Sequence, residues 1–314
     1  MKTWTVLVYL AGDNGRFLSS LEGEGVSDLM EMKGVGSSAA VNIVAQFDAM
    51  SDGACRRYYI TKGTRLADDL VRDLGETNSG DAQVLLDFIS WGIRAYPAEH
   101  YLLVLWNHGA GWKDDDVYAP YRALSRQGRL PPAPPHIAGR RVSRALFRRS
   151  LEAILEEEAN RVLLLGNAQH RGRSESGPTV PEVLPAGWIS PPDVHDEQPT
   201  RPTVAVAGPA RGVYPRAICF DDSSKDFLDS REMTEVLNAA VSLIGKKIDV
   251  LGFDACLMSM IEVAYQVRTG ARVMVASEDV EPGNGWPYSE ILTTLTGDPT
   301  ISPQDLGKAI IAHY

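Results

Sequence analysis

Continuous apolar runs recur along this chain, and they restrict its fold more than any other feature. The runs at 5–10 and 101–106 are unbroken, and those at 41–47 and 249–253 also contain Asn42, Gln46 and Asp249; each is followed within two residues by glycine, asparagine or aspartate. A run of this kind is typical of a strand buried on both faces, as in a parallel sheet. Segments with helical spacing of apolar residues cover 17–32, 81–94, 230–244 and 257–267. Further strands are expected at 57–61, where the strand is short and exposed, at 217–221 and at 273–277. The alternation predicts an α/β, doubly wound, mostly parallel sheet with helices on both faces.

The middle of the chain differs from both ends in composition. Residues 113–215 hold fourteen of the nineteen prolines, thirteen arginines and one lysine, whereas the rest of the chain is acidic. From 170 to 215, core-sized apolar residues are few, and such a segment buries too little surface to order itself well. We therefore predict one α/β domain formed by 1–112 and 216–314, interrupted by a long, irregular, partly disordered insert at 113–215.

Charge and hydropathy exclude several classes of function. A net charge of −10 and a pI of about 5.1 argue against nucleic acid as a partner. No apolar run approaches the roughly 20 residues that cross a bilayer, so we expect no membrane span. The first fifteen residues lack the separate core and cleavage site of a signal peptide and favour a strand. The chain ends at 310–314 inside an expected helix, which favours a polypeptide that continues, and the oligomeric state stays open.

Two strand ends carry the residues with reactive side chains. The run at 101–106 is followed by Asn107, His108 and Gly109, and the run at 249–253 is followed by Asp254, Ala255 and Cys256. In an open α/β sheet, sites collect beyond the carboxyl ends of the strands, so His108 and Cys256 are expected to meet there. A thiolate with a histidine as its proton acceptor is a nucleophile for acyl transfer.

The backbone around these two residues suits the same chemistry. The expected helix from 257 onward would place Cys256 at a helix N-terminus, where the dipole favours a thiolate. The N–H groups of Gly109 and Cys256 are candidates for binding the oxyanion of an acyl-transfer intermediate.

Cysteine and histidine residues also have simpler roles than catalysis. A lone cysteine is most often a small buried hydrophobe, and we assign that role to Cys55 and Cys219. Three cysteines do not make a disulfide framework. No Cys-x-x-Cys or His-Glu-x-x-His spacing indicates a metal site. A nucleotide-binding or nucleotide-hydrolysing α/β domain would need a phosphate loop, and the sequence shows none.

Several motifs, taken together and in order, resemble the clostripain family of cysteine peptidases. They are Asn-His-Gly-Ala-Gly-Trp at 107–112, Phe-Asp-Ala-Cys-Leu-Met at 253–258 and the segment from Ser-Glu-Asp to Gly-Trp-Pro-Tyr at 277–288. The segments 8–14, 41–48 and 218–228 fit the same family. The resemblance covers roughly 1–112 and 216–314 and leaves the middle out.

This resemblance implies a caspase-like fold with a His108–Cys256 dyad. It also implies peptide or protein substrates cut after a basic residue, classically Arg, and activation by a cut in the central region. Lys is a further possible P1 residue, and because the insert is rich in arginine, we expect the enzyme to make that cut itself. Some family members need calcium. The alternative is a peptidase-like protein that has lost activity and serves as a binding or regulatory module, but loss of His108 or Cys256 would mark it and both are present.

A basic P1 side chain needs a carboxylate in its pocket. Asp254, two residues before Cys256, matches the family position; its alternative role is a helix N-cap. Relatives often carry a second acid where this chain has Asn284, which keeps hydrogen bonding but loses the charge. Asn14 is a candidate for lining the entrance of the same P1 pocket, although a residue of the turn after the first strand is the simpler interpretation. The acids at 278, 279 and 281 are expected to form a solvated loop.

Overall fold

The computed structural model describes residues 1–14, 20–109, 218–224 and 226–314. The predicted insert at 113–215 lies outside these residues, and so do Ala110, Gly111 and Trp112 of the His108 motif. The boundaries 1–112, 113–215 and 216–314 therefore stay predictions.

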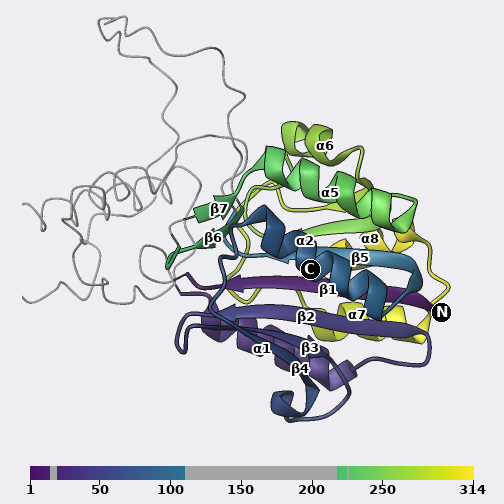
Figure 1. The fold of residues 1–314 in the computed structure, drawn as a ribbon. Coiled ribbons are helices and arrows are strands. Elements are labelled where there is room, and N and C mark those ends of the chain that lie inside the picture. Colours follow the sequence, from purple (N-terminus) through teal and green to yellow (C-terminus); the bar gives the residue numbers. More distant parts are fainter. Residues whose placement is uncertain (15–19, 110–217, 225) are drawn as a thin grey trace, which may run out of the picture. The chain divides into compact units, whose positions relative to one another are not determined.

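A seven-stranded sheet organises the described residues, in the order β4-β3-β2-β1-β5-β8-β9 (Figure 1). Its strands are β1 (Lys2–Gly12), β2 (Val41–Ala49), β3 (Ala54–Tyr59), β4 (Leu70–Gly75), β5 (Ala98–Trp106), β8 (Ile248–Asp254) and β9 (Ala271–Val275). The five strands β2, β1, β5, β8 and β9 pair in parallel, and β3 and β4 add antiparallel pairs at one edge. This confirms the predicted mostly parallel sheet. A separate hairpin joins β6 (Ile218–Asp221) to β7 (Asp226–Leu228).

The helices follow the predicted segments with two exceptions and one addition. They are α1 (Glu22–Val35), α2 (Ala82–Ala95), α5 (Ser230–Ile244), α6 (Ile261–Val267), α7 (Tyr288–Gly297) and α8 (Pro303–His313), with a 3-10 turn η1 (Leu66–Asp69). The predicted start at 17 was wrong for α1, which begins at Glu22, and the predicted start at 257 was wrong for α6. The addition is α7, which the sequence reasoning missed. The start of α5 is fixed by a capping box between Asp229 and Glu232.

Strand β3 corrects a second prediction. The sequence reasoning placed a short exposed strand at 57–61, but β3 runs from Ala54 to Tyr59 and four of its six residues are buried. Arg57 explains the difference, because its side chain is only 1% exposed. Its guanidinium donates to Gln46 and Asp87 at 2.8 and 2.7 Å and lies over the Trp91 ring. The charge of Arg57 therefore led to the prediction of an exposed strand, although its paired guanidinium is buried.

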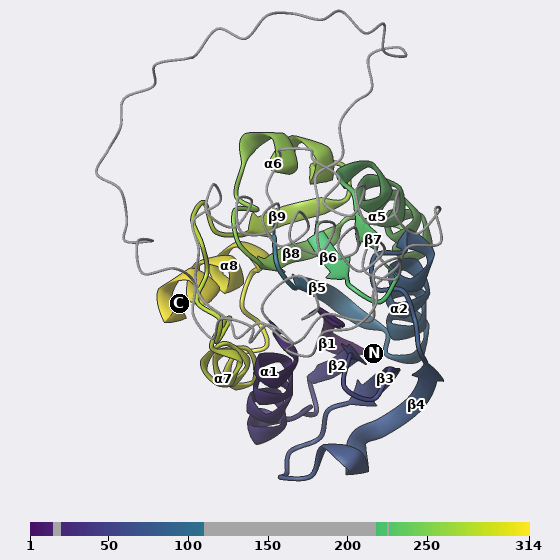
Figure 2. The ribbon, with the colours of Figure 1, turned by 90° about the vertical axis from the view of Figure 1, so that its left-hand side faces the viewer.

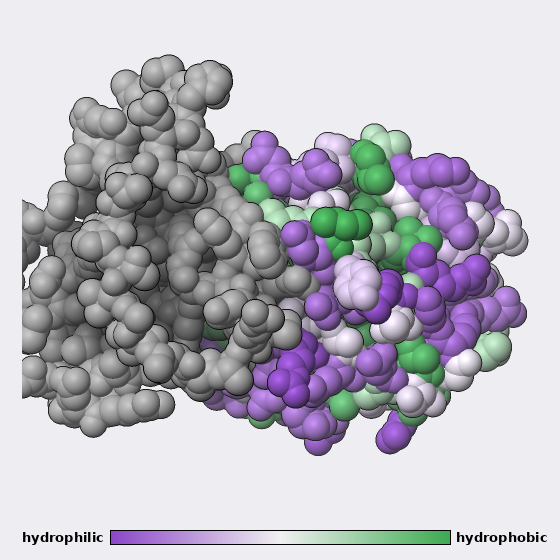
Figure 3. Space-filling view, turned by 90° about the horizontal axis from the view of Figure 1, so that it is seen from above, coloured by the Kyte–Doolittle hydropathy of each residue, from purple (hydrophilic) through white to green (hydrophobic). Residues whose placement is uncertain are grey.

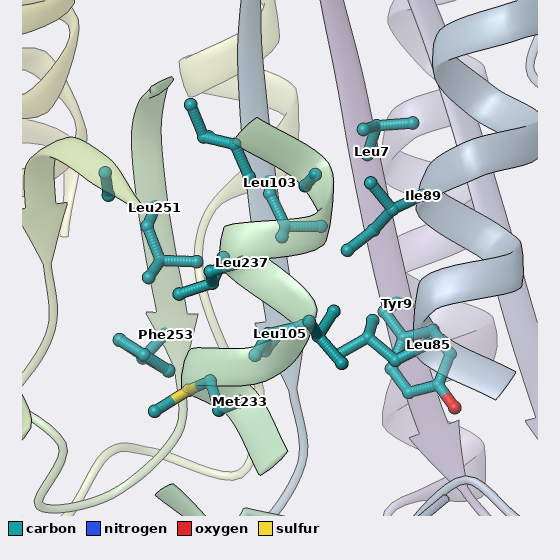
Figure 4. Close-up of a cluster of buried hydrophobic side chains, with 14 of the residues drawn as sticks. Leu7, Tyr9, Leu85, Ile89, Leu103, Leu105, Met233, Leu237, Leu251 and Phe253 are labelled. Carbon is teal, nitrogen blue, oxygen red and sulfur yellow. The ribbon is translucent and has the colours of Figure 1, made fainter. Parts of the chain in front are cut away.

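Alternating side chains of the parallel strands build two cores, one on each face of the sheet. Leu7, Leu103 and Leu251 point to the side of α2, α5 and α6, as Figure 4 shows for the first core. Val6, Leu102 and Val250, one residue away in each strand, point to the side of α1, α7 and α8. Figure 2 shows the two helix layers on opposite sides of the sheet. Burial on both faces is why these strands read as continuous apolar runs.

The outer surface is mixed in character. In the space-filling view of Figure 3, the described part shows small hydrophobic patches separated by hydrophilic residues. None of the helices in the described ranges is long and apolar enough to cross a membrane.

Candidate active site

The parallel register brings the ends of three strands to one edge of the sheet. Leu10 of β1 pairs with Trp106 of β5, and Trp106 pairs with Asp254 of β8. The residues that follow each strand therefore emerge side by side. This places the segment that begins with Asn107 next to the segment that leads to Cys256, as the sequence predicted.

Asn107 holds this edge together through its side chain. Its amide donates to the carbonyls of Ala11 and Phe220 at 2.5 and 3.2 Å, and its oxygen accepts the Phe220 N–H at 3.0 Å. Its own backbone N–H donates to the Asp254 carbonyl at 3.3 Å. One buried amide thus ties together the ends of β1, β5, β6 and β8, which fixes the start of the segment that carries His108.

Gly109 brings the segment that carries His108 against the backbone of Cys256. Gly109 forms an isolated antiparallel bridge with Ile218 and lies against the backbone of Cys256. A Cβ atom at position 109 would lie 3.1 Å from the Cys256 backbone nitrogen and would overlap its carbonyl oxygen. The residue after His108 must therefore be glycine for the two segments to touch. His108 and Cys256 themselves are both partly exposed.

The predicted helix that begins at 257 is absent, which corrects the proposed dipole effect on Cys256. Leu257 has a left-handed φ of 65°, and its N–H donates to the Asp279 carbonyl at 3.1 Å. Ser259 likewise donates to the Ser277 carbonyl at 2.8 Å, and α6 begins only at Ile261. The residues after Cys256 therefore form backbone hydrogen bonds with 277–279, the segment that follows β9, instead of forming a helix. Within the described residues, Cys256 therefore does not lie at a helix N-terminus, and Asp254 is not a helix N-cap.

The surroundings of Cys256 keep its thiol protonated. Burial raises the pKa of this thiol above its usual value, and the nearby Glu281 and Asp254 carboxyl groups raise it further. The Glu281 N–H, which donates to Cys256 Sγ at 3.3 Å, acts in the opposite direction. A sulfur nucleophile at this position therefore needs a proton acceptor, and among the residues placed at this edge His108 has the required chemistry.

Asp254 is buried beneath the cysteine and held from the side of α7. One of its oxygens accepts the Trp286 N–H at 3.1 Å and the Tyr288 hydroxyl at 2.9 Å. The side chain of Glu281 is also in hydrogen-bonding contact with it. Burial raises the pKa of Asp254 to about 6, and these hydrogen bonds oppose that rise.

Asn284 and Asn14, the other two predicted substrate-binding residues, lie in different settings. Asn284 is exposed in the turn before Gly285, which has a φ of 58°. Asn14 is fully buried: its side chain donates to the Ala11 carbonyl at 2.7 Å and accepts the Leu21 N–H at 2.9 Å. Both of its polar atoms thus hold the turn between β1 and α1, which favours the turn role over contact with a substrate.

Two acids of the site were missed by sequence reasoning. Glu281, expected in a solvated loop with residues 278 and 279, is only 7% exposed, and Asp28 of α1 is 1% exposed. Asp28 had a usable signal, because it precedes the buried Met32 by one helical turn and so shares its face. Glu281 had none, because three acids in a polar loop look alike until the loop is folded.

A second group of buried carboxyl groups lies around Asp48 at the end of β2. Asp48 Oδ2 accepts the Ser79 and Thr77 hydroxyls at 2.6 and 3.3 Å, and burial raises the pKa of Asp48 to about 8. Asp221 is similar, with a pKa raised to about 7, mainly by burial. Even so, the described residues hold no group of three or more His, Cys, Asp or Glu side chains that could hold a metal ion. The calcium requirement implied by the resemblance therefore stays a prediction.

Comparisons with known proteins identify the family of this chain. The sequence profile of the Clostripain family matches residues 8–125 and 207–314. Clostripain from Hathewaya histolytica is 39% identical over 98 residues, which cover 29% of this chain and 19% of that protein.

Two solved structures share the fold. One is a secreted C11 cysteine protease from Bacteroides thetaiotaomicron in complex with an irreversible peptide inhibitor, with a TM-score of 0.55 and 20% identity over the whole chain. The other is a secreted C11 cysteine protease of the same organism called iotapain, with a TM-score of 0.51 and 14% identity over 95% of the chain. The chain spans 58% of the length of each. These likenesses support the caspase-like fold that the motifs implied. With a family profile that matches most of its length, this chain belongs to the clostripain family.

Proposed function

We propose that this chain is the peptidase part of a cysteine endopeptidase that cuts after basic residues with a His108–Cys256 dyad. The observation that carries the proposal is the contact between Gly109 and the Cys256 backbone, two residues after the buried carboxylate of Asp254. It supports a site in which an acid/base residue, a thiol and a buried carboxylate belong to one sheet edge. Without any one of these three groups, the other two could not cleave a peptide after a basic residue.

The chemistry follows from the protonated resting thiol. His108 accepts the proton of Cys256 as the sulfur attacks the carbonyl carbon of the scissile bond, and the C–N bond then breaks as His108 returns that proton to the leaving amine. A water molecule, deprotonated by His108, hydrolyses the thioester and restores the thiol. The N–H groups of Gly109 and Cys256 are our candidates for stabilising the oxyanion in both steps.

Preference for a basic P1 residue rests on the buried acid. Asp254 is 4% exposed, so its charge is weakly screened and a cation that reaches it replaces lost solvation. Asn284, by contrast, is exposed, and its lack of charge matters less than the sequence alone suggested. We expect cleavage after both Arg and Lys, with Arg preferred because a guanidinium can pair with two oxygens.

Self-cleavage within 113–215 is part of the same proposal. The segment carries thirteen arginines and one lysine, which are candidate cut sites for an enzyme of this specificity. Attachment to the same chain raises their effective concentration to roughly the millimolar range if the linker is flexible. The insert would then be a substrate before any other protein is.

A P1 scan tests the proposal. Fluorogenic peptides that differ only in Arg, Lys, Ala or Asp at P1 are compared with and without a calcium chelator, in the unsubstituted chain and in Cys256→Ala and His108→Ala. Hydrolysis of the Arg and Lys peptides should vanish in Cys256→Ala and fall by at least a hundredfold in His108→Ala. Equal rates with and without Cys256, or a preference for Ala or Asp at P1, would contradict it. The chelator arm decides separately whether calcium is needed.

A further inference from the structure

Three carboxyl groups from three different elements converge behind Cys256. A Cβ atom built on Gly285 would lie 3.1 and 3.3 Å from the two oxygens of Asp254 and 3.3 Å from Asp28 Oδ2. Asp254 comes from the end of β8, whereas Asp28 comes from the buried face of α1. The two acids therefore face one small region, and any side chain larger than hydrogen at 285 would enter it.

Glu281 is the third acid, and its backbone contacts the sulfur of Cys256. Its backbone N–H donates to Cys256 Sγ, and its carboxyl group contacts Asp254. Hydrogen bonds from the Trp286 side chain and the Ala255 backbone also reach this carboxyl group. Glu281 thus contacts both the nucleophile and Asp254. A P1 side chain extends from the carbonyl that the nucleophile attacks, so we expect it to enter the same region.

This group of acids has unused hydrogen-bonding capacity. Glu281 Oε2 and Asp28 Oδ2 are buried and have no hydrogen-bond partner. The exposed fractions of the two residues are 7% and 1%. Buried oxygens of this kind are normally satisfied, and each costs free energy while it is not. A guanidinium offers five N–H donors in one plane, and an ammonium offers three.

The groups that face these acids disfavour a further negative charge beside them. They come from α1, α7 and the Cys256 segment and comprise Glu24, Asp28, Glu31, Tyr288 and Cys256. Burial is the main cause that raises the pKa of Glu281 to about 10 and of Asp28 to about 9. The charge of Asp254 is the largest electrostatic contribution to both.

We propose that Glu281 is a second P1-recognition residue, which gives up its proton to solvent when a cationic P1 side chain enters and then pairs with that cation beside Asp254. The inference rests on the proposed cleavage after basic residues and adds a residue to it. The exchange balances: one positive charge enters the pocket and one proton leaves it. A neutral P1 side chain should bind less tightly, because it brings no positive charge to take the place of the proton.

Calorimetry at pH 8 tests the exchange in the Cys256→Ala chain, which binds peptide without cutting it. The ligands are a short peptide with arginine at P1 and the same peptide with citrulline, a neutral side chain of nearly the same shape. Each is titrated in two buffers of different ionisation enthalpy, so that the number of protons released per peptide can be obtained. We expect close to one proton released with arginine and none with citrulline.

Two substitutions at matched positions assign the proton. Glu281→Gln should remove the release and weaken binding of the arginine peptide at least tenfold, while binding of the citrulline peptide changes little. Glu278→Gln is the control, because this acid lies three residues earlier in the same loop and is exposed. It should leave both the release and the affinity unchanged.

Failure of this inference differs from failure of the proposed function. If the unsubstituted enzyme does not cut after Arg or Lys, the proposed function itself fails. If it does, and the Cys256→Ala chain binds the arginine peptide without releasing a proton, the role of Glu281 is refuted, whether or not Glu281→Gln folds. A release that persists in Glu281→Gln would also refute it and would assign the proton to Asp28.

Discussion

A methyl group added at Gly109 tests the contact on which the active site depends. In Gly109→Ala, the new Cβ would lie closer than 3.0 Å to the Cys256 carbonyl oxygen, whereas ordinary contact begins at 3.4 Å. The 107–109 and 255–257 segments must therefore separate by more than 0.4 Å. Both sides of the clash are backbone, so no side-chain rotation relieves it. A misplacement of about 1 Å in an active site costs roughly a hundredfold in rate, so we expect a loss of ten- to a hundredfold.

The assay compares kcat/KM for an arginine peptide with the midpoint of thermal unfolding. Overpacking of this kind should also cost about 1–3 kcal/mol in the free energy of unfolding. Gly283→Ala is the matched control, because Gly283 is exposed in the loop after Glu281 and a Cβ there would meet nothing within 4 Å. It should change neither quantity. The placement of His108 beside Cys256 would be refuted if kcat/KM of Gly109→Ala stayed within twofold of the original value and its free energy of unfolding stayed within 0.5 kcal/mol.

Three further predictions follow from the same structure. Asp254→Asn should lower selectivity for Arg over Ala at P1 by about 2–3 kcal/mol, whereas Asn284→Asp, in an exposed turn, should raise it far less; equal effects in the P1 scan would contradict the buried pocket. The purified chain should slowly convert into two fragments cut within 113–215, and Cys256→Ala should stay intact in mass spectra over the same period; identical cutting of both would point to a contaminating protease. Asp48 keeps its proton in the folded chain up to a pH of about 8, whereas in the unfolded chain it loses the proton near pH 4. The free energy of unfolding should therefore fall as the pH rises between those values, by up to about 1.4 kcal/mol per pH unit. Asp48→Asn should flatten this fall in urea unfolding between pH 5 and 8, and an unchanged slope would show that Asp48 is not its cause.

The sequence alone determined the sheet and the edge at which the chemistry occurs. Runs such as 101–106 and 250–253 are apolar at every position because both faces of a parallel sheet are covered by helices. Their ends are visible as well, since polar residues follow the last buried one. Parallel strands end at a common edge, so predicting that the segments of His108 and Cys256 lie side by side needed no knowledge of distant contacts.

Only the tertiary structure decided how the site is surrounded. The segment after Cys256 has helical apolar spacing, yet Leu257 and Ser259 bond to the 277–279 segment, and that long-range pairing overrides the local preference. Glu281 and the exposed acid three residues before it share the same local pattern. Their fates differ because one packs against Asp254, 27 positions away in the chain. Periodicity reports which face of an element is buried, but burial of a loop residue depends on what folds over it, and that information is not local.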